Sequence, residues 1–395
     1  MNGVFNLNIQ PSVRVGIVEN GGFGLHLQGE YNISGDENSI TYIPQNEDCR
    51  VIVDNVEIGK HFHWHRKQQQ SFEGIMQIRN IANDHSCLIN ILPIEKYLKS
   101  VISSEMNPNS HLEFLKAHAV ISRSWVMRMI SKTNNNLADD RCYNGSRIID
   151  WTDSAMHQAF DVCADDHCQR YQGDSIVNKN AEIAVSQTVG EVLVDMNGEI
   201  CDARFSKCCG GKTERFSSSW QPIDYHYLQS VVDPYCNPND LTEYEYTQLR
   251  KSILNSYDSE TTDFYQWQHK ISGKKIRDNI LKYYNIDVGE IKAFTPLKRG
   301  VSGRIIELQI EGSLKSIIVG KELTIRKLLS DTHLYSSCFS IERRDDEFVL
   351  FGKGWGHGVG LCQIGAAIMA QRGFSYRDIL CYYYQNSKII KIYER

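Results

Sequence analysis

Apolar and polar residues alternate along the first part of the chain with the period of β-strands. Residues 13–18 are rich in valine, residues 23–28 alternate, and the glycine pair at 21–22 signals a turn between them. Residues 61–66 (HFHWHR) also alternate, which places their three histidines on one strand face. These patterns predict a small β-rich unit over residues 1–85.

The period changes to that of a helix after a short predicted strand at residues 88–91. Ile94, Leu98 and Val101 recur at spacings of four and three, so they share one helical face. Glu105 follows four residues later on the same face. A carboxylate is therefore predicted at the end of an otherwise apolar helix face.

Further elements follow from turn signals and periodicity. Residues 191–195 and 200–206 are predicted to pair as a hairpin across Asn197-Gly198. The other predicted elements are a helix from Pro93 to about Asn107, helices near 112–130, 240–256 and 324–329, a hairpin of 304–310 with 314–319, a strand pair of 338–343 with 347–351, and two final helices, the second with a capping box of Ser375 and Asp378. Helices and strands mix without a βαβ rhythm, which predicts an α+β fold of mixed helices and antiparallel strands.

Composition limits the class of protein. Hydrophobic residues make up 41% of the 395-residue chain and charged residues 23%, a balance typical of a globular protein. The net charge of −5 argues against a general nucleic-acid binder, which would normally be basic. Neither a membrane-spanning apolar stretch nor a signal peptide is expected from the sequence.

Glu105 is the first candidate for chemistry. Desolvation on an apolar face raises the pKa of a carboxyl group, which keeps a proton available for general acid catalysis near neutral pH. The alternative is a glutamate in the last helical turn that simply reaches water. Glu95, about 80° around the helix at ~100° per residue, and Glu113, at the start of the next helix, are not expected to be catalytic.

A second candidate is a group of four metal-binding residue types within a dozen positions. Two histidines and two cysteines suit tetrahedral zinc, and the set comprises His157, Cys163, His167 and Cys168. His167 and Cys168 are adjacent, so the backbone there must be irregular for both to reach one ion. The alternative is two core cysteines and two surface histidines.

A third candidate is the segment FGKGWGHGVG at residues 351–360, in which every second residue is glycine. Alternating glycines remove side chains from one face, so that a ligand can approach the backbone closely. Trp355 can stack on a sugar, and His357 can donate or accept hydrogen bonds. The alternative is a close-packed strand crossing.

Weaker signals remain. The turn CCGGKT at 208–213 offers Lys212 and Thr213 as polar donors. His61 and His63 lie two apart on one predicted strand face and could bind a metal, although such histidines are more often solvated. The 12 cysteines cluster, and a Cys208–Cys236 or Cys209–Cys236 disulfide is an alternative if the protein is exported.

Several of these motifs, in this order, resemble the stage II sporulation protein D family, which includes amidase-enhancer proteins. The motifs are LPIEKYLKSVISSEMNP at 92–108, LKAHAVISRSW at 115–125, ARFSKCCGGKTERFSSSW at 203–220, YLQSVVDPYC at 227–236, and GKGWGHGVGLCQIGAAIMAQRGFSYRDILCYYYQNSKI at 352–389. The resemblance covers about residues 85–390.

The resemblance implies a peptidoglycan lytic transglycosylase. Such enzymes cleave the bond between N-acetylmuramic acid and N-acetylglucosamine, prefer strands stripped of stem peptides, and leave a 1,6-anhydro product. Glu105 matches the catalytic glutamate of the family's YL…EM motif, and the His157, Cys163, His167 and Cys168 set resembles a structural zinc site of some members. Substrate contacts are expected from Lys212, Thr213, Gly354, Trp355, Gly356, His357 and Gln363.

This reading divides the chain into a β-rich unit (1–85), a first part of the catalytic core (86–236), an accessory α+β segment (237–345) and a second part of the core (346–395). A periplasmic or cell-wall location and glycan-strand partners, with a cell-wall amidase as a further partner, are expected. Two alternatives stay open: a non-catalytic wall-binding module that stimulates an amidase, and a zinc-dependent amidase.

Overall fold

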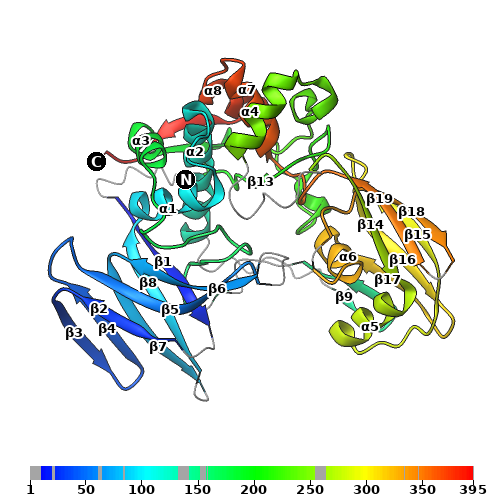
Figure 1. Cartoon of the computed structure of the whole chain (residues 1–395), viewed down its shortest axis with the longest axis horizontal. Coiled ribbons are helices and arrows are strands. Elements are labelled where there is room, and N and C mark those ends of the chain that lie inside the picture. Colours follow the sequence, from blue (N-terminus) through cyan, green and yellow to red (C-terminus); the bar gives the residue numbers. More distant parts are fainter. Residues whose placement is uncertain are drawn as a thin grey trace.

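The computed structural model describes residues 10–19, 23–60, 65–82, 85–131, 142–151, 157, 159–253, 264–332, 334–345 and 347–394. Among them lie eight α-helices and 21 strands, and most strand pairs are antiparallel, which confirms the predicted α+β fold. Two lobes are visible in Figure 1, one built mainly from the first half of the chain and one from residues beyond 264. None of the helices in these ranges has the length and apolar character of a membrane span.

The first lobe contains two sheets from the N-terminal region. One is six-stranded, with the order β11-β1-β8-β7-β4-β3, and the other is β2-β5-β6. Their bounds are β1 Ser12–Glu19, β2 Leu25–Gln28, β3 Tyr31–Asp36, β4 Ser39–Pro44, β5 Arg50–Ile58, β6 Arg66–Phe72, β7 Ile75–Ala82, β8 His85–Pro93 and β11 Val162–Cys163. Because β8 pairs with both β7 and β1, the sheet runs across the predicted division at residue 85/86.

Helices pack on this sheet and share its core. The helices of the lobe are α1 Ile94–Glu105, α2 Leu112–Ser131, α3 Lys179–Gln187, α4 Glu243–Ile253, α7 Gln363–Gln371 and α8 Tyr376–Tyr383. Ile94, Leu98 and Val101 of α1 are fully buried, as their spacing predicts. One continuous hydrophobic core joins these helices to β1, β5 and β8.

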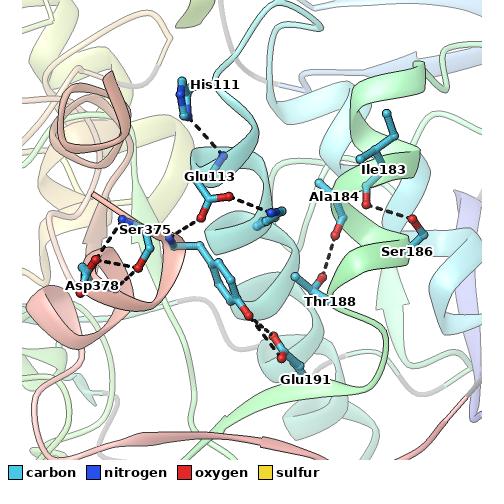
Figure 2. Close-up of polar contacts among 11 residues, drawn as sticks. His111, Glu113, Ile183, Ala184, Ser186, Thr188, Glu191, Ser375 and Asp378 are labelled. Carbon is cyan, nitrogen blue, oxygen red and sulfur yellow. Dashed lines mark hydrogen bonds and ion pairs between the residues drawn. The ribbon is translucent and has the colours of Figure 1, made fainter. Parts of the chain in front are cut away.

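α2 is the central helix, because it contacts α1, α3, α7 and α8. Its start is fixed to the C-terminal segment by polar contacts (Figure 2): a Glu113 carboxylate oxygen accepts the backbone N–H of Tyr376 at 2.9 Å. The Tyr376 hydroxyl in turn donates to Glu191 at 3.0 Å. α8 begins with the predicted capping box, in which Ser375 and Asp378 bond each other's backbone N–H groups. The chain end is thereby joined to a helix more than 240 residues earlier in the sequence.

The second lobe has its own core of residues from 148 and 267–350. It contains the sheets β15-β16-β17-β10-β9 and β14-β19-β18 with helices α5 and α6. The bounds are β9 Cys142–Tyr143, β10 Arg147–Ile149, β14 Gln266–Ser272, α5 Gly273–Tyr284, β15 Ile291–Arg299, β16 Ile305–Gly312, β17 Ser316–Gly320, α6 Glu322–Leu328, β18 Phe339–Arg344 and β19 Glu347–Lys353. The β16–β17 and β18–β19 hairpins confirm the predicted pairs.

The hairpin predicted across Asn197-Gly198 forms, but it is shorter than predicted. The tight turn forms, and Val194 and Ile200 make one isolated bridge. However, β12 (Glu191–Val194) pairs along its length with β21 (Lys388–Lys391), and β13 (Phe205–Ser206) pairs in parallel with β20 (Leu361–Cys362). β12 thus pairs with β21 in addition to the short local hairpin, and the strands from the C-terminal end complete the buried core of the first lobe.

Candidate active site and metal centre

A cleft with a volume of about 620 Å³ is lined by residues of both lobes. The end of α1, the turn at 163–170, the segment at 204–207 and the glycine-rich loop line one part of it. The second lobe contributes residues of α6 and its surroundings, including Glu322, Thr324, Arg326 and Lys327. A pocket of this size, with aromatic, acidic and basic side chains together, is suited to a polar ligand such as a sugar chain.

Glu105 is the last residue of α1, and its carboxyl group faces the cleft. One carboxylate oxygen accepts the backbone N–H of Arg170 at 3.0 Å. Burial raises the pKa of Glu105, and the nearby Asp166 adds to this effect, whereas Arg170 and Lys207 oppose it. The net upward shift is the condition that a general acid requires near neutral pH.

A second carboxylate in the cleft, Asp166, has no signal in the sequence pattern. It forms an ion pair with Arg170, whose Nη2 and Nε lie 2.7 and 3.2 Å from the same Asp166 oxygen. Both side chains are largely buried. Arg170 therefore connects the two acids, through its backbone to Glu105 and through its side chain to Asp166. In the sequence, the position of Asp166 is indicated only by its proximity to Cys168.

The four predicted metal ligands converge in the structure. The ligand atoms of His157, Cys163, His167 and Cys168 all lie within 4.8 Å of one another. The Nε2 of His157 lies 3.2 Å from the Nδ1 of His167 and 3.4 Å from the Cys168 sulfur. The two sulfurs lie 3.8 Å (Cys163) and 3.6 Å (Cys168) from His167 Nδ1. The irregular backbone that adjacent ligands require is the turn at 165–168.

These distances fit a tetrahedral zinc ion. Zinc bonds of about 2.0–2.3 Å in a tetrahedron place nitrogen and sulfur ligands roughly 3.3–3.8 Å apart. The backbone that carries them is fixed: β11, which ends at Cys163, pairs with β1, and Asp165 accepts the backbone N–H groups of Gly59 and Lys60.

The glycine-rich loop contributes Trp355, Gly356 and His357 to the cleft lining. Trp355 packs against Tyr335 with the rings tilted by 42°, and His357 lies edge-on to Trp220, with ring centroids 4.6 and 4.8 Å apart respectively. Burial, followed by neighbouring Arg204 and Arg304, holds the pKa of His357 well below its usual value, so this imidazole is neutral.

The glycines of this loop have a structural role that differs from the one expected. Gly356 adopts φ of +87° and Gly358 φ of +77°, a region that side chains rarely tolerate. A Cβ at Gly358 would lie 2.5 Å from the guanidinium of Arg304, which is fully buried. Arg304 donates to the carbonyl oxygens of Gly356 and Cys209 at 3.0 Å. The glycines thus allow a tight turn around a buried arginine, and the close approach of a ligand to their backbone stays a prediction.

Gln363 also lines the cleft, at the start of α7. Its amide Nε2 lies 3.1 Å from Nε2 of His118, a fully buried residue of α2. Burial, with a smaller effect of Lys207, lowers the pKa of His118 to about 3, so its ring is neutral and accepts this hydrogen bond. His118 was not identified in the sequence, where it is one residue of an apolar helix.

The structure does not bring Lys212, Thr213 or Gly354 into the cleft lining. Thr213 is 1% exposed, and its hydroxyl accepts the backbone N–H of Val231 at 2.8 Å. Gly354 is buried, and its carbonyl accepts the indole N–H of Trp267. Thr213 and Gly354 thus have structural roles, and substrate contact by these residues stays a prediction. His61 and His63 lie outside the described residues.

Known proteins resemble this chain in two regions and over most of its length. Residues 82–194 match the family described as Stage II sporulation protein, and residues 214–360 match a family described only as a domain of unknown function. An uncharacterized protein of Brachyspira hyodysenteriae is 29% identical over 78% of this chain and 69% of its own length.

Two relatives from Bacillus subtilis carry functional names. Stage II sporulation protein D is 28% identical over 75% of this chain and 74% of its own length. The protein named amidase enhancer is 26% identical over 74% of this chain, which spans 40% of that relative. Glu105 and all four converging metal-ligand residues fall within the matched region 82–194. Residues 82–194 are therefore similar to the Stage II sporulation protein family, the resemblance that the sequence motifs predict.

Proposed function

We propose that this protein is a lytic transglycosylase that cleaves the bond between N-acetylmuramic acid and N-acetylglucosamine in peptidoglycan glycan strands. Its relatives support a cell-wall-related function. The observation that carries the finer proposal is Glu105, a carboxyl group with a raised pKa in a cleft lined by aromatic side chains. The site of action is then the cell wall or the periplasm.

The mechanism requires one acid/base residue. Glu105 protonates the glycosidic oxygen, and the bond from that oxygen to C1 of the muramic acid residue breaks as an oxocarbenium-like state develops. The 6-hydroxyl of the same sugar then attacks C1 and closes the 1,6-anhydro ring. Its proton passes to the Glu105 carboxylate, which regenerates the acid. Asp166 is engaged by Arg170, so it is not assigned the role of a nucleophile.

The backbone N–H of Arg170 positions the Glu105 carboxyl group during both proton transfers. Arg170 follows Cys168 by two residues, so the fold of the 163–168 turn fixes its position. His157, Cys163, His167 and Cys168 would hold a zinc ion that supplies structural cross-linking rather than chemistry, since four protein ligands leave no open coordination position. This argues against the zinc-dependent amidase.

The second candidate function is that of an amidase enhancer, which is favoured by the similarity to the relative of that name. Such a protein would bind glycan strands through the same cleft and stimulate a cell-wall amidase. It would not need the proton of Glu105. The two functions are therefore separated by the products that the protein makes and by the effect of one substitution.

The test uses peptide-stripped glycan strands and mass spectrometry of the products. The native protein should release 1,6-anhydro fragments, and Glu105→Gln should slow their release by about 10²–10⁴-fold while strand binding persists. Glu182→Gln is the matched control, because Glu182 lies on α3 with its side chain 49% exposed in a pair with Lys99. Strand binding without anhydro products from the native protein would reject the transglycosylase and support the enhancer.

A further inference from the structure

A second cluster of metal-binding residue types lies outside the cleft lining. Cys209, Asp233, Cys236 and Cys362 place their ligand atoms within 4.8 Å of one another, and all four residues are buried. They come from three separate segments: the turn after β13, the 3-10 helix η3 (Pro234–Cys236) with the residue before it, and β20. The fold brings them together across as many as 153 residues of sequence.

We propose that this cluster binds a second structural zinc ion, independently of the site at His157–Cys168 and of the proposed activity. The Cys209 sulfur lies 3.5 Å from the Cys236 sulfur and 3.3 Å from Oδ2 of Asp233. A tetrahedral ion with bonds of about 2.0–2.3 Å requires separations of roughly 3.3–3.8 Å. Three sulfurs with one carboxylate oxygen favour zinc over the harder ions magnesium and calcium.

The groups around the cluster are arranged as they are around metal-bound thiolates and carboxylates. The backbone N–H of Gly211 donates to the Cys236 sulfur at 3.2 Å, and that of Cys209 donates to the Cys362 sulfur at 3.3 Å. The Tyr383 hydroxyl donates to Oδ2 of Asp233 at 2.9 Å. Such outer hydrogen bonds orient ligands and stabilise their charged forms.

Asp233 provides a further reason for a cation. It is 1% exposed, and within the described part of the chain no ion pair joins it to a basic side chain. An isolated carboxylate at such a position costs several kcal/mol in desolvation. The Tyr383 hydroxyl and the backbone N–H of Tyr235 supply hydrogen bonds but no positive charge. A zinc ion would supply that charge.

The cluster also lies next to segments that line the cleft. Cys208, next to Cys209, exchanges two backbone hydrogen bonds with Trp355. Cys362 precedes Gln363, which lines the cleft and contacts His118. An ion that joins these segments would fix the positions of Trp355 and Gln363 in the cleft lining. The cysteines are free, so a disulfide is the competing arrangement rather than an observed one.

The experiment is metal analysis of the purified full-length chain by mass spectrometry. The native protein should hold about two zinc ions, and Cys163→Ser should hold about one, because it removes a ligand of the first site only. Cys236→Ser should also hold about one, and the double variant none. Cys338→Ser is the matched control and should keep both zinc ions. Cys338 is also buried, but it is not part of either cluster, and its thiol donates to the carbonyl oxygen of Ser302.

The Cys163→Ser chain decides the question even if Cys236→Ser does not fold. Replacement of its remaining metal by Co²⁺ should give sulfur-to-cobalt charge-transfer absorption, as expected for a thiolate-rich site. Loss of all zinc from Cys163→Ser would overturn the proposal. Peptide mapping without reductant that finds Cys209, Cys236 or Cys362 in a disulfide would overturn it as well.

Discussion

Two glutamates on α1 allow catalysis to be separated from stability. Glu95 and Glu105 lie on the same helix, yet their surroundings differ. Glu95 forms a bidentate pair with Arg123, with nitrogen–oxygen distances of 2.7 and 2.8 Å. The Arg123 side chain is 0% exposed and that of Glu95 is 12% exposed. Glu105, by contrast, accepts the backbone N–H of Arg170 and faces the cleft.

Glu95→Gln should therefore destabilise the fold. Removal of one partner of a buried ion pair costs about 3–5 kcal/mol, because the remaining charge is left uncompensated. Glutamine retains one oxygen that can accept from Arg123, Tyr393 or Gly190, so we expect the lower end, about 3 kcal/mol. That is a large share of the ~5–15 kcal/mol that stabilises a typical domain. Glu95→Gln is thus unsuitable as a control that leaves the fold unchanged, although the sequence predicts that Glu95 is not catalytic.

Glu105→Gln should behave in the opposite way. Its amide oxygen can still accept the Arg170 N–H, and the substitution removes a carboxyl group whose ionisation the fold disfavours. Stability at neutral pH should be unchanged or increased. Activity should fall by about 10²–10⁴-fold, which corresponds to a barrier increase of about 3–5 kcal/mol.

The assay combines urea unfolding with the release of anhydro products for both variants. For Glu95→Gln, a loss of about 3 kcal/mol should lower the urea midpoint by roughly 1 M or more, given slopes of about 1–3 kcal/mol/M. Its remaining folded fraction should retain activity. The reasoning fails if Glu95→Gln unfolds at the native midpoint, or if Glu105→Gln loses as much stability as Glu95→Gln.

Three further predictions follow from the site. The pKa of Glu105 is raised in the folded state, so its stabilising contribution is present below the ordinary carboxyl pKa and is lost as pH rises through the raised value. Across that pH window, the free energy of unfolding of Glu105→Gln should increase relative to that of the native protein. Parallel curves of unfolding free energy against pH would contradict the shift. Cys163→Ser should lower zinc content and melting temperature together, and unchanged melting of metal-free protein would exclude a structural ion. Trp355→Ala should weaken glycan-strand binding in a pull-down assay by about tenfold or more, and normal binding by the folded variant would show that Trp355 does not contact the strand. Gly356→Val should fail to fold, because Gly356 has a positive φ.

Local sequence determined most of the secondary structure. The spacing of Ile94, Leu98 and Val101 predicted α1 and its buried face, and the capping box predicted the start of α8. The set of His157, Cys163, His167 and Cys168 was recognisable because ligands close in sequence need only one turn to converge. These features depend on residues a few positions apart, where backbone geometry restricts the arrangements.

The long-range partners were decided by the tertiary structure alone. β12 pairs along its length with β21 and only briefly with its sequence neighbour, because the C-terminal strand completes the core of the first lobe. Arg304 fixes the glycine-rich loop from 52 residues away and leaves no room for a Cβ at Gly358. The Thr213 hydroxyl accepts the backbone N–H of Val231, so this polar residue of the CCGGKT turn does not reach the cleft.

The same distinction holds for the chemistry of the site. Sequence indicated that Glu105 lies on an apolar face, but the direction of its pKa shift depends on burial and on Asp166, Arg170 and Lys207 together. The cluster of Cys209, Asp233, Cys236 and Cys362 was only partly visible as clustered cysteines, since its third sulfur lies 126 residues beyond the second. Periodicity records which face of an element is buried, whereas electrostatic and metal-binding properties depend on atoms that only packing brings within a few ångströms.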